Sequence, residues 1–208
     1  VAWLIRDATS GGLEAVRQGV FQSRAILTTT GYASTDFALW SGPAQTVLIL
    51  LMFVGGSAGS AAGGIKVVRL MIVAKNTARE VRRALHPRAV LPVRIGARAV
   101  PEEVLRAVAA FITLYVALFV AVAAALALQG ADFTTAFTAA IACLGNIGPG
   151  FGAVGPMANF ADLPDLSKGV LTFAMYAGRL EVVAVFVIFT ADWWKVPRGW
   201  RSRVWRWA

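Results

Sequence analysis

Two short polar loops in this sequence carry residue types that could bind a cation. The first loop covers residues 28–32 around Gly31, and the second covers residues 146–149 around Gly148. Backbone carbonyls can replace the hydration shell of an alkali cation when a loop aims several of them inward. Glycine allows the dihedral angles that such a loop needs, and threonine adds a hydroxyl oxygen. Neither loop contains a carboxylate, so the pattern favours a monovalent cation that leaves quickly.

Each loop follows a short segment that we predict to be a helix. The first covers residues 12–27, and the second begins after Asp132, a good helix N-cap, and should end near Cys143 or Leu144. A helix of about 13 residues is roughly 20 Å long, too short to cross a bilayer. Its C-terminus carries about half a negative charge, which favours a cation in the loop. We therefore predict a re-entrant helix and a glycine-rich return over residues 132–155.

The two loop segments define a weak internal repeat. Alignment of Gly31 with Gly148 gives an offset of 148 − 31 = 117 residues, and each copy then reads short helix, polar loop, membrane helix. The first copy lacks the outer membrane helix that should precede Gly12, and the chain begins at Val1 rather than at a methionine. We therefore expect the chain to be a fragment of a longer protein.

A glycine-rich stretch, residues 55–64, interrupts an apolar run over residues 38–74. As one straight helix this run would be about 55 Å long, against about 30 Å of hydrocarbon in a bilayer. Backbone polar groups at membrane depth need partners in the protein or a water-filled path. A broken helix at that depth is typical of a conduction or transport pathway.

Composition indicates an integral membrane protein. The chain is 58% hydrophobic and 15% charged, with a mean hydropathy of +0.66, which excludes an ordinary soluble domain. Residues 107–128 carry no charge, and residues 169–191 are charged only at Arg179 and Glu181. We predict that each of these two stretches is one spanning helix.

The basic residues predict the orientation in the membrane. Of the 20 Lys and Arg residues, ten lie within residues 66–106 and five within residues 195–206, beside the apolar spans. This positive-inside pattern places both blocks in the cytoplasm and the re-entrant segment on the outer side. Tryptophans interleaved in the last block fit anchoring at the membrane interface, so the net charge of +9 does not predict binding of nucleic acid.

Five motifs resemble the Trk/Ktr/HKT superfamily of potassium transporters. Its third repeat is similar to TTTGYASTDF (28–37), FVGGSAGSAAGGIKVVR (53–69) and HPRAVLPVRIG (86–96), and its fourth to ACLGNIGPGFGAVGP (142–156) and MYAGRLEVVAVFVIF (175–189). The details are closest to the C-terminal half of the bacterial TrkH-type potassium-uptake membrane subunit. The resemblance implies an all-α membrane protein of helix–pore loop–helix repeats, with re-entrant pore helices and one broken transmembrane helix.

The resemblance also implies a division of the chain into four regions. Residues 1–80 would be a third-type repeat that lacks its first helix, and residues 103–192 a complete fourth-type repeat. Residues 81–102 would be a basic cytoplasmic linker, and residues 193–208 a basic, tryptophan-rich cytoplasmic tail.

Two sets of site residues follow from the resemblance. The selectivity filter, which would bind potassium through backbone carbonyls, comprises Thr29, Thr30, Gly31, Tyr32, Asn146, Ile147, Gly148 and Pro149. The intramembrane gate loop that would block the pore below the filter comprises Gly55, Gly56, Ser57, Gly59, Ser60, Gly63 and Gly64. Small residues suit a mobile plug, because they combine low bulk with accessible dihedral changes.

Arg179 lies within a predicted span, where an arginine costs several kcal/mol unless it faces water or a partner. Glu181 is two residues away and projects from another helix face, so it is a poor partner within the same helix. One interpretation is a structural ion pair between helices. The other, which the resemblance favours, is a positive barrier in the pore beneath the filter, hydrogen-bonded to carbonyls of the gate loop.

The predicted function is channel-like potassium uptake, without enzymatic activity. A sodium or mixed-cation transporter of the same superfamily, a secondary transporter with broken helices and a non-transporting scaffold are the alternatives. We expect no cofactor, with potassium as the substrate, and the lone Cys143 excludes an intramolecular disulfide. The expected partners are membrane lipid, a second copy in a homodimer and a TrkA-like cytoplasmic nucleotide-binding regulatory subunit, and the expected location is the bacterial inner membrane.

Overall fold

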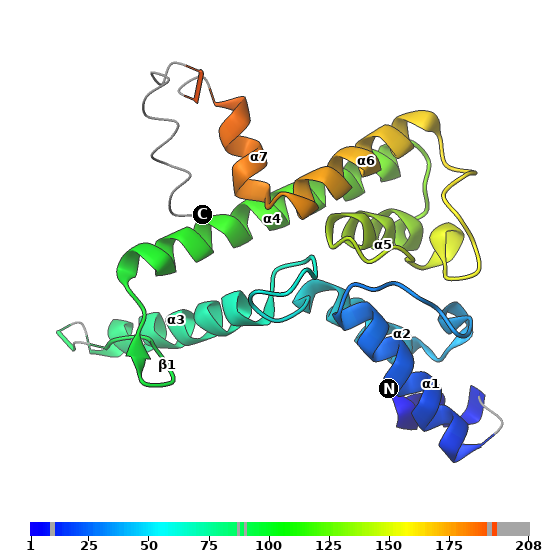
Figure 1. Cartoon of the computed structure of the whole chain (residues 1–208), viewed down its shortest axis with the longest axis horizontal. Coiled ribbons are helices and arrows are strands. Elements are labelled where there is room, and N and C mark those ends of the chain that lie inside the picture. The colour runs from blue at the N-terminus through cyan, green and yellow to red at the C-terminus, as the bar shows by residue number, and fades with distance from the viewer. Residues whose placement is uncertain (9–10, 87, 90, 191–192, 195–208) are drawn as a thin grey trace.

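Helices make up nearly all of the regular structure (Figure 1). The computed structural model describes residues 1–8, 11–86, 88–89, 91–190 and 193–194. In chain order the elements are the 3-10 helix η1 (Ala2–Ala8), α1 (Gly12–Leu27), the 3-10 helix η2 (Phe37–Leu39), α2 (Gly42–Val54), α3 (Val67–Leu85), β1 (Arg94–Ile95), β2 (Arg98–Ala99), α4 (Glu102–Leu128), α5 (Phe133–Leu144), the 3-10 helix η3 (Gly152–Val154), α6 (Asp165–Arg179) and α7 (Val182–Phe189). The all-α class is confirmed, and most of the predicted tail lies outside the described residues.

Both predicted short helices are present with the predicted ends. α1 spans residues 12–27, and α5 begins after Asp132, whose carboxylate accepts a hydrogen bond from the Thr135 N–H at 3.1 Å. α5 is only 12 residues long and packs against α2, α4 and α6. Nine of its 12 residues are buried, so a short helix that cannot cross a bilayer lies at the centre of the fold.

Two buried threonines of α5 hold the chain that returns from the second loop. The Phe151 N–H donates to Thr138 Oγ1 at 2.9 Å, and the Ala153 N–H donates to Thr135 Oγ1 at 2.9 Å. The returning chain has no long regular element of its own, so side chains must satisfy its backbone groups. The threonines therefore fix the distance between the re-entrant helix and its return.

Among the described helices, α4 alone is long and apolar enough to cross a bilayer by itself. α6 and α7 pass that test only when taken together, and they meet at an angle of 110°. The prediction of one straight span over residues 169–191 is therefore wrong. The break falls at Glu181, whose backbone (φ 64°, ψ 125°) cannot continue a helix and whose carboxylate bonds to two basic side chains near the start of α3.

The predicted break in the apolar run over residues 38–74 is confirmed. α2 ends at Val54 and α3 begins at Val67, so the glycine-rich stretch lies between two helices. α3 then continues to Leu85 as an amphipathic helix rich in basic residues. The antiparallel pair β1–β2 connects it to α4, and the Lys75 ammonium donates to the Arg94 carbonyl at 2.7 Å, which ties this hairpin to α3.

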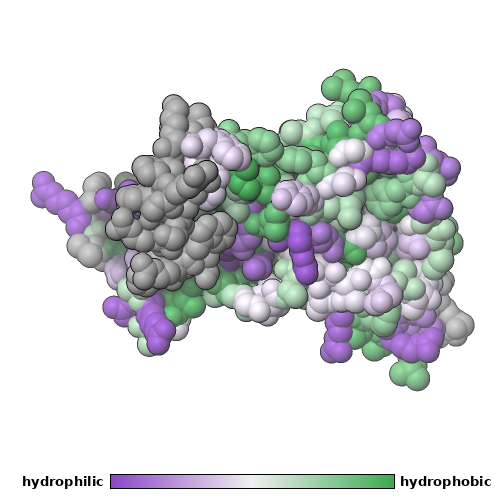
Figure 2. Space-filling view, turned by 45° about the horizontal axis from the view of Figure 1, so that its top comes forward, coloured by the Kyte–Doolittle hydropathy of each residue, from purple (hydrophilic) through white to green (hydrophobic). Residues whose placement is uncertain are grey.

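The packing leaves an extensive apolar exterior. Figure 2 shows hydrophobic side chains over much of the visible face, with hydrophilic groups mainly near the two ends of the molecule and one further group near the middle. Exposed apolar side chains on α4 include Val116 and Val120. Large exposed apolar surface of this kind is expected where lipid or further protein covers a membrane helix.

Loss of the Thr138 hydroxyl should destabilise the protein. Thr138→Val leaves the buried Phe151 N–H without its acceptor, which should lower the free energy of unfolding by about 1–3 kcal/mol. The matched control is Thr113→Val, because the exposed Thr113 hydroxyl bonds only to a carbonyl of its own helix, that of Ala109. Thermal unfolding of the purified protein in detergent should give a lower midpoint for the first variant alone, and equal midpoints would contradict this role.

Candidate ion pathway and gate

The two polar loops share one backbone plan at the predicted offset of 117 residues. Thr29 and Asn146 have positive φ angles of 55° and 54°, and Gly31 and Gly148 follow with φ angles of 73° and 114°. The hydrogen bonds that close the helix ends also match. The Thr30 N–H donates to the Ala25 carbonyl at 2.9 Å, and its counterpart runs from the Ile147 N–H to the Ala142 carbonyl at 2.8 Å. The repeat that is weak in sequence is therefore close in structure.

The two loops lie against each other. A Cβ atom on Gly31 would fall 1.8 Å from the Ile147 carbonyl oxygen and 3.2 Å from the Pro149 side chain, so no side chain fits there. Within the described part of the chain, the carbonyls of residues 29–31 and 146–148 accept no hydrogen bond. Each loop also sits at the C-terminus of a short helix, where the partial charge is negative. The arrangement offers free oxygen ligands of the kind that binds an alkali cation.

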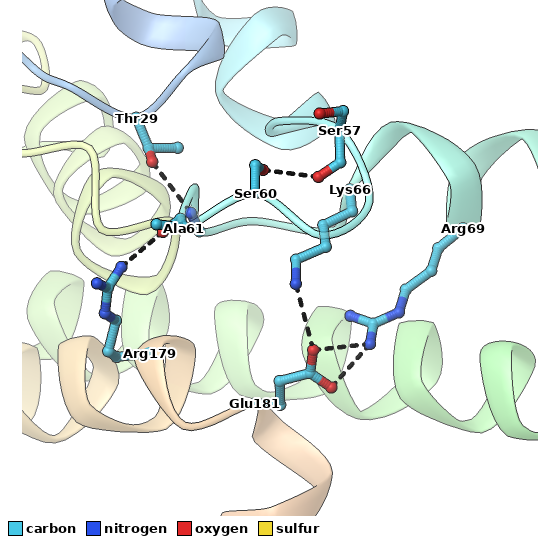
Figure 3. A network of polar contacts seen from close by, with 9 residues as sticks. Thr29, Ser57, Ser60, Ala61, Lys66, Arg69, Arg179 and Glu181 are labelled. Atoms are coloured by element: carbon cyan, nitrogen blue, oxygen red, sulfur yellow. Dashed lines mark hydrogen bonds and ion pairs between the residues drawn. The ribbon is translucent and has the colours of Figure 1, made fainter. Parts of the chain in front are cut away.

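The gate loop, residues 55–64, lies against both polar loops. The Gly63 N–H donates to Thr29 Oγ1 at 3.0 Å (Figure 3). A Cβ atom on Gly63 would fall 2.2 Å from the Gly145 carbonyl oxygen, just before the second loop, and 3.3 Å from the Asn146 Cβ atom within it. The two ends of the loop are tied together by a bond from the Val67 N–H to the Gly56 carbonyl at 3.0 Å. Gly63 of the predicted gate loop is thus brought together with Thr29 and Asn146 of the predicted filter.

Three predicted site residues lie at the margin of this arrangement. The Tyr32 side chain is 73% exposed, so it does not pack between the loops. Ser57 and Gly59 occupy the exposed part of the gate loop, where the Ser60 hydroxyl donates to the Ser57 carbonyl at 2.6 Å. The contacts with the polar loops come from the other end of the gate loop, near Gly63.

Arg179 is the last residue of α6 and contacts the gate loop. Its guanidinium Nη1 donates to the Ala61 carbonyl at 2.7 Å (Figure 3). Among the described residues no ion pair involves Arg179, and Glu181 lies beyond the end of α6 rather than on another face of it. The arrangement agrees with the second of the two interpretations of Arg179, although its role as a barrier stays a prediction.

Lys66 and Glu181 form a pair that the sequence reasoning missed. Each precedes the helix after a break, α3 or α7, and the two have nearly the same backbone dihedrals, φ 72°, ψ 132° and φ 64°, ψ 125°. Glycine adopts this region readily, whereas other residues are strained there by about 1–3 kcal/mol. The Lys66 ammonium lies 3.5 Å from the Glu181 carboxylate, and the Arg69 guanidinium bonds to both carboxylate oxygens at 2.9 and 2.7 Å.

A cavity of about 210 Å³ lies beside the gate loop. It is lined by gate-loop residues 60–64, by Lys66, Arg69, Arg179 and Glu181, and by residues of α4 and of the α6–α7 break. Three of these side chains are cations and one is an anion, so the lining carries excess positive charge. A cation would therefore find the space beyond the gate loop less favourable than the carbonyl-lined side.

Gly178 is a second residue that the sequence reasoning did not single out. A Cβ atom there would fall 1.9 Å from the Leu144 carbonyl oxygen, at the end of the re-entrant helix. The Asn146 amide also donates to the Met175 carbonyl at 3.2 Å, so α6 contacts both the end of α5 and the second loop. No local signal marks this glycine, because its contact partner lies 34 residues away in the sequence.

The fold and the two loops define a helical membrane protein built from repeats with re-entrant helices. Comparison with known protein families identifies the family to which the chain belongs. The chain belongs to the TrkH family, described as cation transport proteins, whose family model matches residues 9–195.

Individual relatives agree with this assignment. The "Trk system potassium uptake protein TrkH" of Halomonas elongata is 39% identical over 193 residues, which are 93% of this chain and 39% of the relative. TrkG of Escherichia coli K12, also a Trk system potassium uptake protein, is 38% identical over 177 residues, 84% of this chain and 36% of the relative. The crystal structure of the potassium transporter TrkH from Vibrio parahaemolyticus superimposes with a TM-score of 0.85 at 36% identity, covering 93% of this chain and 41% of that one.

The chain therefore spans about two fifths of the length of the relatives that it matches. The family membership and the membrane location follow from these matches. The correspondence to the C-terminal half of the subunit stays a prediction.

The Gly178 contact predicts a sharp difference between two glycines of the same helix. Gly178→Ala forces a Cβ atom into the Leu144 carbonyl and should cost about 1–3 kcal/mol of stability. Gly169→Ala is the control, because nothing lies within 4 Å of its Cβ position and alanine favours a helix. The melting temperature of the purified protein in detergent should fall for the first variant alone. Equal behaviour of the two variants would exclude a tight contact between α6 and α5.

Proposed function

We propose that this chain supplies two filter loops of a potassium-uptake path across the bacterial cytoplasmic membrane. The pairing of two loops in one backbone register, with unbonded carbonyls beside a glycine contact, is the observation that carries the proposal. The matched relatives are named potassium uptake proteins, which favours potassium over sodium as the ion. Because the chain spans part of each relative, the activity is inferred for the complete gene product.

The proposed path is channel-like. A dehydrated potassium ion would be bound by carbonyls of Thr29, Thr30, Gly31, Asn146, Ile147 and Gly148, together with the equivalent loops of two further repeats. The C-termini of α1 and α5 would add their partial negative charges on the outer side. The membrane potential would drive the ion inward, and weak carbonyl ligands would let it leave quickly.

The gate loop would close this path on the inner side of the filter. Its contacts with both polar loops support this role, since a plug must lie across the axis that the loops share. Arg179 would hold the plug through the Ala61 carbonyl and would repel a cation that passes the filter. The bond to the Ala61 carbonyl would be lost when the gate loop moves away.

The basic region formed by α3, the hairpin β1–β2 and the start of α4 would lie in the cytoplasm. There it is the surface available to a TrkA-like nucleotide-binding regulatory subunit, in an assembly whose membrane part is a homodimer. Arg79 bonds to Glu102, so an ion pair joins α3 to the start of α4. A fixed junction would pass a movement of the regulatory subunit on to α3.

Replacement of a filter glycine should weaken selectivity in the complete gene product. Gly31→Ser would push a side chain into the Ile147 carbonyl, and Gly148→Ser would strain a residue with φ 114°. We expect the potassium-to-sodium permeability ratio, measured from bi-ionic reversal potentials, to fall about tenfold or more, equivalent to a loss of about 1.4 kcal/mol in discrimination.

Gly42→Ser is the control for these two filter variants. Gly42 begins α2, and nothing lies within 4 Å of its Cβ position, so the reversal potential should not change. If both filter variants keep the parent's reversal potential, the two loops are not the filter.

Removal of part of the plug should raise the basal flux. Deletion of residues 59–63 shortens the gate loop without removing a filter residue, although it also removes the Gly63 N–H that bonds to Thr29. Arg179→Ala removes the bond to the Ala61 carbonyl and a positive charge. We expect the deletion to have the larger effect, because it removes the steric block as well as the anchor. Rubidium uptake into proteoliposomes measures both, with Arg17→Ala, an exposed arginine of α1, as the control. Reduced uptake by normally folded deletion and Arg179→Ala variants would make the loop a structural support instead of a gate.

A further inference from the structure

Two breaks in different repeats are joined by one carboxylate. Glu181 stands at the break before α7. Its carboxylate forms an ion pair with Lys66 at the break before α3 and accepts hydrogen bonds from Arg69 in the first turn of that helix (Figure 3). The Arg69 guanidinium also lies over the Phe111 ring of α4, 4.0 Å from its centroid. The four side chains of Lys66, Arg69, Phe111 and Glu181, the clamp, therefore connect three helices.

The clamp holds two residues that have strained backbone conformations. Lys66 and Glu181 both occupy a region of positive φ that favours glycine. Neither conformation is stabilised by a side-chain cap on the helix that follows. The contact between the two side chains is therefore a force that keeps both breaks bent at once, and its loss would favour straightening of both.

We propose that Glu181 is a positioning residue that holds the gate loop in the closed arrangement by clamping the two breaks together. The gate loop ends at Gly64, two residues before Lys66, so the bend before α3 sets where the loop lies. Arg179, which holds the loop from α6, stands two residues before Glu181, so the second bend sets where that anchor points. Release of the clamp frees the loop at both attachments and opens the path.

The ion pairs of the clamp can be broken, because their carboxylate is partly exposed to solvent. Glu181 is about half exposed and faces two cations that are largely buried, while Nη1 of Arg69 and the Tyr115 hydroxyl have no hydrogen-bond partner among the described residues. Arg69 and Tyr115 are both among the residues that line the cavity beside the gate loop. The site can thus exchange partners without leaving the cations in a closed apolar core.

The proposal rests on the proposed function and is tested in the complete gene product by single-channel recording in lipid bilayers. Glu181→Gln keeps the size of the side chain and the strained backbone but removes the charge. We expect the open probability to rise about tenfold, which corresponds to about 1.4 kcal/mol in the closed–open equilibrium. Glu181→Asp should restore most of the closed population, because it restores the carboxylate.

A glycine variant separates the clamp from a merely structural contact. Glu181→Gly also removes the carboxylate, but glycine adopts the bent backbone without strain, so the closed state loses less. We expect its open probability to lie between those of the parent and of Glu181→Gln. Arg69→Gln should raise the open probability as well, and the double variant with Glu181→Gln should exceed Glu181→Gln by less than the sum of the separate effects. Asp162→Asn, an exposed carboxylate on the outer loop, is the control.

The outcomes distinguish failure of the clamp from failure of the pathway. If the filter variants change the reversal potential but Glu181→Gln leaves the open probability within twofold of the parent or lowers it, the clamp is wrong and the pathway stands. A glycine variant that opens as much as or more than Glu181→Gln would also overturn the clamp, since strain would then play no part. If the filter variants leave selectivity unchanged, the pathway itself is wrong. Lys66→Met provides a second test should Glu181→Gln fold poorly, with the same expected direction.

Discussion

Backbone N–H and C=O groups inside a bilayer need hydrogen-bond partners or ion ligands. Some irregular segments of this chain find partners within the protein, whereas the two polar loops leave carbonyls free among the residues that the structure describes. In the return after the second loop, buried threonine hydroxyls of α5 accept the Phe151 and Ala153 N–H groups. In the gate loop, backbone groups bond to the Val67 N–H, to Thr29 and to Arg179. The carbonyls of residues 29–31 and 146–148 are instead left without protein partners in the described part of the chain. Unpaired carbonyls at membrane depth are tolerable where an ion or water supplies the missing contact.

Backbone strain occurs in the two polar loops, at the first residue of each of these two sets of carbonyls. Thr29 is β-branched and has φ 55°, which is uncommon for such a residue, whereas its counterpart Asn146 tolerates that region more easily. The Thr29 hydroxyl accepts the Gly63 N–H, so a contact with the gate loop helps to hold the strained residue in place. In the second repeat the Asn146 amide bonds to α6. One backbone plan is therefore supported in two ways, one of which depends on the position of the gate loop.

Features set by neighbouring residues could be predicted from the sequence, and features set by distant contacts could not. The ends of α1 and α5 follow from length, from the Asp132 cap and from the polar residues after each helix, all of which are local. The glycine-rich break was visible in the same way. The bend at Glu181 was not, because nothing in the uncharged residues that follow it interrupts a helix. Its partner Arg69 lies 112 residues away, and the Gly178 contact with Leu144 is likewise tertiary.

Charged residues, and not glycines, occupy the two breaks at Lys66 and Glu181. Glycines do occur nearby, at 64 and 178, where the neighbouring backbone leaves little or no room for a side chain. Both segments therefore use glycine where close packing requires it, but not at the breaks. Charged residues occupy the strained positions instead. Strain of about 1–3 kcal/mol at each break opposes the bent form, while the two hydrogen bonds that Arg69 donates to the Glu181 carboxylate, at about 1.5–3 kcal/mol each, favour it. Two opposing terms of comparable size give an element with two accessible states, which a regulatory contact of a few kcal/mol can shift. Glycine at both breaks would remove the strain and the pair together, and with them this means of switching.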